Sequence, residues 1–365
     1  MELFNASGAA RRLQASPLFA LGPSEPGPAL RRGALVAIPV GLALLLELGL
    51  GSASKGAIGT GALLAGFPGL DAPARTRAGW QAATAPLIGL AAALGVLTGS
   101  NAFLAIAAMA LVGAAAGYCF AVSLRFSIAG LSVALSLLIA QDLPLDLADT
   151  IPALLLATAG GLLQAAFSLC VWIAGDHTED GAANAWSWHG ARSALEANLN
   201  LGSGSFRHAL RFGTALASGV AVYWLLGIHD HGFWIPLTIL FVLRPEREET
   251  FHRLVLRAVG TIVGLVIATA LAKWLGGDGV AVALALAIAT AFAYGLLTVQ
   301  YALFTAAITT YAVLLADSIG EEALHAAGQR ALATAIGIAI AGTAFLIWPN
   351  PADPRARRAE PISSA

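Results

Sequence analysis

Residues 33–50 read GALVAIPVGLALLLELGL, an apolar run with a single charged side chain, Glu47. A run of this kind is typical of a helix that crosses the hydrocarbon core of a membrane, for which about 20 residues are needed. The rest of the chain has the same character, because 58% of its 365 residues are hydrophobic and only 11% are charged. A typical soluble domain has about 25% charged residues. The composition therefore excludes a cytosolic enzyme and predicts an all-α membrane protein.

Apolar runs divide the chain into about twelve predicted transmembrane helices. The first six lie at about 33–50, 56–70, 79–98, 101–121, 126–141 and 151–174. The second six lie at about 209–228, 232–243, 254–275, 279–296, 298–316 and 329–348. The runs at 56–70 and 232–243 are short for a full crossing, so each could instead be re-entrant.

The predicted helices give a division of the chain into five parts. We expect a cytoplasmic N-terminal tail, a first six-span membrane repeat, a cytoplasmic linker, a second six-span membrane repeat and a cytoplasmic C-terminal tail, at residues 1–30, 31–174, 175–206, 207–349 and 350–365. The first 30 residues lack an apolar core followed by a small-residue cleavage site, so no cleavable signal peptide is expected. Cys119 and Cys170 lie inside apolar runs, where we expect packing residues rather than a disulfide or metal ligands.

The basic residues indicate the orientation, because lysine and arginine concentrate on the cytoplasmic side of membrane proteins. With twelve spans and both termini inside, 17 of the 20 basic residues fall in cytoplasmic segments. Lys55, Lys273 and Arg330 are left on the outer side. The distribution predicts a multi-pass protein of a bacterial inner membrane with both termini in the cytoplasm.

The two halves of the chain resemble each other at an offset of 176 residues. This offset aligns Arg31 with Arg207, Arg77 with Arg253, Tyr118 with Tyr294 and Trp172 with Trp348. Six spans return the chain to its starting side of the membrane. We therefore expect two parallel six-helix repeats related by a pseudo-twofold axis along the membrane normal, as in many transporters.

The most specific local pattern lies between residues 232 and 264. It consists of Gly232, Phe233, Trp234, Ile235, Pro236, Leu237, Thr238, Leu243, Arg244, Pro245, Thr250, Arg253, Arg257, Gly260, Thr261 and Gly264. The pattern resembles the signature of the fusaric acid resistance (FUSC) family of aromatic acid exporters. Near the end of the chain, Arg330, Thr334, Gly337, Trp348 and Pro349 resemble the end of the same domain. The specific match covers about residues 207–349.

The resemblance implies an inner-membrane protein that exports aromatic carboxylates, driven by the proton gradient. Two features depart from the family pattern. Many family members carry a soluble domain between the halves, where this chain has only the linker at 175–206, and the first repeat lacks the motif of the second. A similar hydropathy profile in plant aluminium-activated malate channels keeps a passive anion channel as an alternative. A third possibility is a structural or assembly protein of the envelope that transports nothing.

Arginine and neighbouring residues in the second repeat are the candidates for substrate binding. Arg253 and Arg257 are one helical turn apart and share a face, and a guanidinium group binds a carboxylate through paired hydrogen bonds. Thr261 lies one turn further on, and Trp234 could stack on an aromatic ring. Both arginines could instead be topogenic charges, and Trp234 could be an interfacial anchor.

Arg330 lies on the expected outer side, against the charge rule, close in sequence to Glu321 and Glu322. An ion pair with these glutamates is one explanation, and an exit site for the anion is the other.

Glu47 and the cluster His229, Asp230 and His231 are the candidates for proton coupling. A carboxylate within an apolar run usually faces the interior of the bundle or a water-filled path, although Glu47 could simply point to water near the outer surface. Histidine titrates near neutral pH, although two histidines in a solvated loop are often just polar turn residues.

Several kinds of activity are not expected from this sequence. Catalytic and phosphate-binding motifs are absent by inspection, so we expect no enzyme, no cofactor and no metal site. The formal net charge of −1 favours no nucleic-acid partner. The expected partners are membrane lipid, a small organic anion, and either further copies of the chain or a periplasmic adaptor protein.

Overall fold

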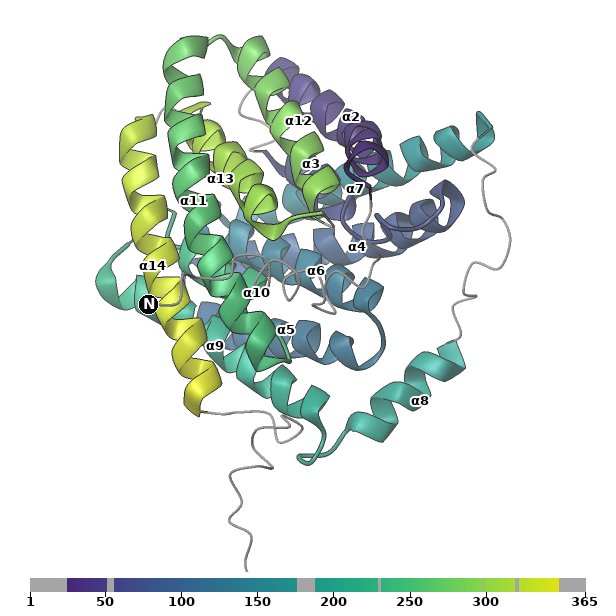
Figure 1. The fold of residues 1–365 in the computed structure, drawn as a ribbon, viewed down its shortest axis with the longest axis vertical. Helices are drawn as coiled ribbons and strands as arrows, with labels where there is room; N and C mark the ends of the chain where they lie inside the picture. The colour runs from purple at the N-terminus through teal and green to yellow at the C-terminus, as the bar shows by residue number, and fades with distance from the viewer. Residues whose placement is uncertain are drawn as a thin grey trace, which may run out of the picture.

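The computed structural model describes residues 25–50, 56–175, 188–228, 231–297, 299–318 and 322–347. These residues form thirteen α-helices, α2 to α14, and two short 3-10 helices at Cys119–Ala121 and Leu147–Asp149. Ten helical segments are long and apolar enough to cross a membrane. The chain is therefore a multi-pass, all-helical membrane protein (Figure 1).

The helices of the two halves follow one another in matching order. The first half contains α2 (Pro26–Leu50), α3 (Ala57–Ala65), α4 (Ala74–Gly99), α5 (Ala102–Tyr118), α6 (Leu124–Asp142) and α7 (Thr150–Ile173). A short helix, α8 (Trp188–Asn198), follows and touches the rest of the protein at its C-terminal end, where the Tyr118 hydroxyl donates to the Leu195 oxygen. The second half contains α9 (Gly204–Leu226), α10 (Trp234–Val242), α11 (Arg247–Leu275), α12 (Gly279–Leu296), α13 (Tyr301–Ser318) and α14 (Ala323–Ile347).

The two runs that could be either full crossings or re-entrant segments form short helices, so no single helix crosses the membrane at these positions. The runs at 56–70 and 232–243 contain α3 and α10, which have only 9 residues each. Nine residues of helix extend about 14 Å, about half of a hydrocarbon core of roughly 30 Å. Non-helical segments, 66–73 and 243–246, connect these helices to α4 and α11. Each crossing is thus a broken helix, which is tolerated at membrane depth where protein surrounds it or where it lines a cavity.

Glycine and proline account for the breaks. After α3 the chain contains Gly66, Pro68 and Gly69, and Gly69 has a φ of 71°, a conformation that glycine adopts without strain. After α10 it contains Arg244 and Pro245, and a residue before proline is disfavoured in helical conformation. Both breaks are therefore encoded locally.

Four helix pairs form the main contacts of the body. α4 packs along α7 and α11 along α13, each within one half, whereas α2 packs along α12 and α5 along α9, joining the halves. Glycines permit the close approach: a Cβ on Gly33 of α2 would lie 2.4 Å from the Ala291 oxygen of α12, and one on Gly213 of α9 would lie 2.5 Å from the Ala110 oxygen of α5. Small residues commonly allow helices in lipid to approach closely.

Arginines at the starts of several helices gather at one end of the body, which we call the arginine-rich end. Arg125 of α6 forms a salt bridge of 2.8 Å with Asp71 in the segment after α3. Arg77 of α4 donates to the Ala72 oxygen at 3.4 Å. Arg32 of α2 donates to the Leu70 oxygen at 3.5 Å. The starts of α2, α4 and α6 are thereby tied to the segment that completes the broken crossing.

Candidate anion-binding site

Two arginines lie inside the second half with no exposure to solvent. Arg257 is about three turns into α11, Arg330 is about two turns into α14, and both side chains are 0% exposed. None of their guanidinium nitrogens has a hydrogen-bond partner in the described part of the protein. The Tyr301 hydroxyl lies near both groups and is the nearest polar neighbour of Arg257, but it does not meet hydrogen-bond geometry with the guanidinium nitrogens and donates to the Phe241 oxygen at 3.2 Å.

Aromatic rings of α10 lie against this arginine pair. The guanidinium carbon of Arg257 is 5.5 Å from the ring centroid of Phe241, and that of Arg330 is 5.2 Å from that of Trp234. A desolvated cation–π contact is worth about 2 kcal/mol, whereas burying a charge costs several kcal/mol per ion. The rings hold the guanidinium groups in place without compensating the cost of burying them. An anion bound between α10, α11 and α14 would supply that compensation.

Four buried threonines on α11, α13 and α14 have hydroxyl groups without a partner in the described residues. Thr261 follows Arg257 by one turn and Thr334 follows Arg330 by one turn, while Thr305 and Thr309 of α13 pack on α11. All four are nearly or fully buried, and their hydroxyls have no partner in the described residues. By contrast, Thr238 of α10 donates to the Trp234 oxygen four residues earlier, at 3.0 Å. The four free hydroxyls can therefore donate to a ligand.

The close approach of α11 and α13 places Thr305 and Thr309 against the two glycines that follow Arg257 in α11. A Cβ on Gly260 would lie 2.3 Å from the Ala302 oxygen and 2.7 Å from the Thr305 Cβ. Thr310 also donates to the Gly264 oxygen across the same contact, at 3.2 Å. Gly260 and Gly264 of the family-like motif thus serve the packing of α11 against α13.

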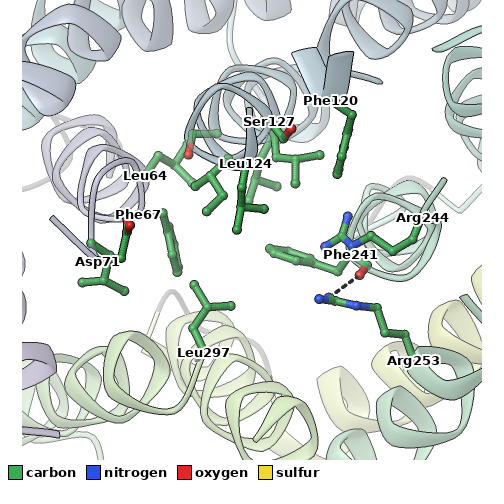
Figure 2. A pocket seen from close by; sticks show the side chains of 15 residues that line it. Leu64, Phe67, Asp71, Phe120, Leu124, Ser127, Phe241, Arg244, Arg253 and Leu297 are labelled. Carbon is green, nitrogen blue, oxygen red and sulfur yellow. Dashed lines mark hydrogen bonds between the residues drawn. The ribbon is translucent and has the colours of Figure 1, made fainter. Parts of the chain in front are cut away.

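A cavity opens where the segments after both broken helices meet (Figure 2). It has about 870 Å³ of empty space, part of it open to solvent. Figure 2 shows Leu64, Phe67 and Asp71 on one side and Phe241, Arg244 and Arg253 on the other. Asp71 is held by Arg125. The cavity therefore combines apolar walls with two guanidinium groups, a lining that suits an apolar carboxylate.

The two arginines of the cavity share one acid. Glu249 of α11 lies 3.2 Å from Arg253 and 3.5 Å from Arg244. Arg253 also donates to the Phe241 oxygen at 3.2 Å, the contact drawn as a dashed line in Figure 2. One carboxylate against two guanidinium groups leaves a local charge of +1 beside the cavity.

Most of the substrate-binding residues predicted from the sequence meet in this region. Arg253 lines the cavity, Arg257 and Arg330 form the buried pair, and Trp234 contacts Arg330. Thr261 is 2% exposed, one turn beyond Arg257. The interpretation of Trp234 as an interfacial anchor is wrong, because its side chain is also only 2% exposed.

The predicted location of Arg330 is also wrong. It was expected near the outer surface beside Glu321 and Glu322, but α14 begins at Ala323 and carries Arg330 into the protein interior. No salt bridge joins Arg330 to Glu322, which is exposed at the start of α14, and Glu321 lies outside the described residues.

Of the predicted proton-coupling residues that the structure describes, Glu47 lies at α3, whereas His231 lies next to the arginine pair through Trp234. The Glu47 carboxylate accepts hydrogen bonds from the backbone amides of Ile58 at 2.8 Å and Gly59 at 3.0 Å, so it caps the first turn of α3 instead of simply pointing to water. His231 stacks on Trp234, with ring centroids 4.2 Å apart. His229 and Asp230 lie outside the described residues.

Sequence reasoning missed part of the site. Phe241, Tyr301, Thr305 and Thr309 were not singled out, because an isolated aromatic or threonine in an apolar run carries no specific signal. Thr305 and Thr309 are spaced by one turn, which places them on one face of α13. That spacing is the available clue, and it gains meaning only once α11 is known to pack there.

These features define a class of protein: a multi-pass membrane protein with an uncompensated cationic site in its interior. The comparison with protein families narrows the class, because residues 216–344 match the family described as "Fusaric acid resistance protein-like". This segment contains α10 to α13, almost all of α14 and the arginine pair. The resemblance found in the sequence is thereby confirmed for the second half.

Curated relatives match about two fifths of the chain. "Inner membrane protein YccS" of Escherichia coli is 39% identical over 150 residues, covering 40% of this chain and 20% of that protein. "Uncharacterized protein slr1298" of Synechocystis is 34% identical over 164 residues, covering 41% of this chain and 20% of that protein. "Uncharacterized protein ORF2" of Neisseria gonorrhoeae is 29% identical over 158 residues, covering 43% and 37%. The matched regions thus span only a fifth to about two fifths of these relatives, and no solved structure matches the chain.

Proposed function

We propose that the protein is an efflux transporter of organic, aromatic carboxylates in a bacterial inner membrane. The observation that carries this proposal is the pair Arg257 and Arg330, two fully buried guanidinium groups without partners in the described residues. Buried charged groups at membrane depth commonly mark substrate or ion paths. The match to fusaric acid resistance proteins and the name of the E. coli relative support the substrate class and the membrane.

A path for the anion follows from the order of the cationic groups. The anion would enter the cavity at the arginine-rich end, where Arg244 and Arg253 are available. Arg257 lies one turn beyond Arg253 on the same face of α11. From the arginine pair the anion would pass Trp234 and His231 at the other end of α10. By the positive-inside rule the cavity end would be cytoplasmic, and export would run from the cavity towards the other end of α10.

We infer that the two halves are parallel repeats of one ancestral unit. Helices of 25, 9, 26, 17, 19 and 24 residues in the first half correspond to helices of 23, 9, 29, 18, 18 and 25 residues in the second. The contact of α2 with α12 has its counterpart in that of α9 with α5. Short, interrupted segments at equivalent positions of two halves are a common mark of a transporter binding site.

Glu47 is the candidate for coupling export to the proton gradient. Its carboxylate stabilises the positive end of the α3 dipole through the amides of Ile58 and Gly59. Tyr311 of α13 lies near it. Protonation would remove the charge and weaken this cap, loosening the broken helix that leads to the cavity. Asp142 of α6 accepts in the same way from the Phe233 amide before α10, at 3.2 Å.

Flux of labelled benzoate from proteoliposomes under an imposed pH gradient tests the proposal. We expect benzoate efflux to rise when protons can enter the vesicle as the anion leaves. Glu47→Gln should remove this dependence of the flux on the pH gradient. Glu196→Gln is the matched control, because Glu196 is an exposed acid of α8 that pairs with Arg192. It should respond to the gradient like the unmodified protein.

Two results would contradict the proposal. Steady currents that reverse at the equilibrium potential of the anion would indicate a passive anion channel. Absence of any benzoate flux, with arginine-pair variants behaving like the unmodified protein, would leave a non-transporting envelope protein as the better explanation.

A further inference from the structure

We propose that the arginine pair binds a dianion carrying its two negative charges on separate carboxylate groups. This inference rests on the proposed function, because it names the substrate class of the same site. It begins with the charge of the site. Arg257 and Arg330 contribute two positive charges, both with 0% exposure. A ligand with one negative charge would leave one buried guanidinium group uncompensated.

Acidic side chains that could neutralise the pair are absent from the middle of the surrounding helices. Within α10, α11, α13 and α14, the acidic residues are Glu248, Glu249 and Asp317, all within one turn of a helix end. Glu249 already forms salt bridges with Arg244 and Arg253. Glu322 is exposed before α14. In the described residues the compensating charge therefore has to come from a ligand.

Two carboxylates on the neighbouring helices α2 and α6 already accept hydrogen bonds from backbone amides. Asp142 of α6 accepts from the Phe233 amide, and Glu47 of α2 accepts from the amides of Ile58 and Gly59. Two groups act on Arg330 electrostatically: the like charge of Arg257 repels it, and the nearby Tyr301 hydroxyl opposes this effect. Two arginines held close enough to repel each other are best satisfied by two negative charges.

The geometry of α10 favours separated charges over a compact dianion. Phe241 and Trp234, which hold the two guanidinium groups, are seven residues apart, or about 10 Å along the helix. Each guanidinium group can donate two parallel hydrogen bonds to its own carboxylate. The hydroxyls of Thr261 and Thr334, one turn from each arginine, would add one donor to each carboxylate.

Binding of a matched pair of ligands to the purified full chain tests this inference. Terephthalate carries two carboxylates, and terephthalamate has the same shape with one carboxylate replaced by a neutral amide. We expect terephthalate to bind at least about tenfold more tightly at neutral pH, a difference of about 1.4 kcal/mol. Arg330→Gln removes one positive charge and should bring the ratio close to one. Arg257→Gln should also bring the ratio close to one, and it replaces Arg330→Gln in the test if that variant does not fold. Arg192→Gln, at an exposed position of α8, should keep the ratio.

The remaining results distinguish failure of the dianion inference from failure of the proposed function. Equal binding of both ligands by the unmodified protein would overturn the inference while leaving an anion site intact. Sulfate bound as tightly as terephthalate would overturn the assignment to separate carboxylates. If terephthalate, terephthalamate, benzoate and sulfate all fail to bind, the inference and the proposed anion site fail together.

Discussion

At the scale of single residues, the binding role proposed for Arg257 and Arg330 comes with a cost to stability. A buried cation without a partner is destabilising, and replacing buried charges by apolar residues of similar volume is often neutral or stabilising by about 1–4 kcal/mol. Four buried threonine hydroxyls without partners add to this cost. A site of this kind trades stability for the ability to bind an anion.

Arg330→Met separates stability from binding. Methionine has a similar length and no charge, so we predict that the ligand-free variant unfolds at a higher temperature than the unmodified protein, with a gain of about 1–4 kcal/mol. The same variant should lose the stabilisation that terephthalate gives. Thermal unfolding in detergent, with and without ligand, measures both effects. A large loss of stability without ligand would mean that Arg330 is satisfied by the protein itself.

Single residues also show where sequence reasoning succeeds and where it stops. Arg257, Thr261 and Trp234 could be predicted because a motif with turn-length spacing places them on helix faces. Arg330 was misplaced, because its distance in sequence from an expected loop says nothing of where α14 begins. The cap formed by Glu47 could not be predicted either, because it depends on α3 folding back against the end of α2.

At the scale of elements, the broken helices α3 and α10 position the site. Their segments 66–73 and 243–246 line the cavity through Phe67, Leu70 and Asp71 on one side and through Arg244 on the other. The short length of both apolar runs, and the proline and glycine residues near their ends, are visible in the sequence. The sequence left open whether each short run crosses the membrane or returns to the side on which it started. In the structure, a short helix and a non-helical segment together connect one long helix to the next.

Gly260→Ala tests the contact of α11 with α13. The added methyl group would lie 2.3 Å from the Ala302 oxygen, so the helices must separate, and overpacking of this kind costs about 1–3 kcal/mol. We predict lower thermal stability and weaker anion binding, because Thr305 moves with α13. Gly79→Ala in α4 is the control, since a Cβ there meets nothing within 4 Å. It should be neutral or stabilising by about 0.5–1 kcal/mol. Equal effects of the two substitutions would show that this helix contact does not position the site.

At the scale of the whole molecule, the two halves are alike in helix order but unlike in chemistry. At the 176-residue offset, Gln81 corresponds to Arg257, Leu154 to Arg330 and Ile58 to Trp234. Gln81 is also fully buried. The equivalent region of the first half therefore lacks the charges, so the buried cationic groups of the proposed anion path belong to the second half, although both halves line the cavity where the path begins. The contacts of α2 with α12 and of α5 with α9 hold this half against the other.

The location of a bromine-labelled aromatic dicarboxylate in crystals of the full chain tests the central claim most directly. Anomalous scattering from bromoterephthalate identifies the ligand without reference to the protein. We predict a bromine peak between α10, α11 and α14, with one carboxylate on Arg257 and the other on Arg330. A ligand bound elsewhere, with both guanidinium groups hydrogen-bonded to side chains of the protein, would contradict the account.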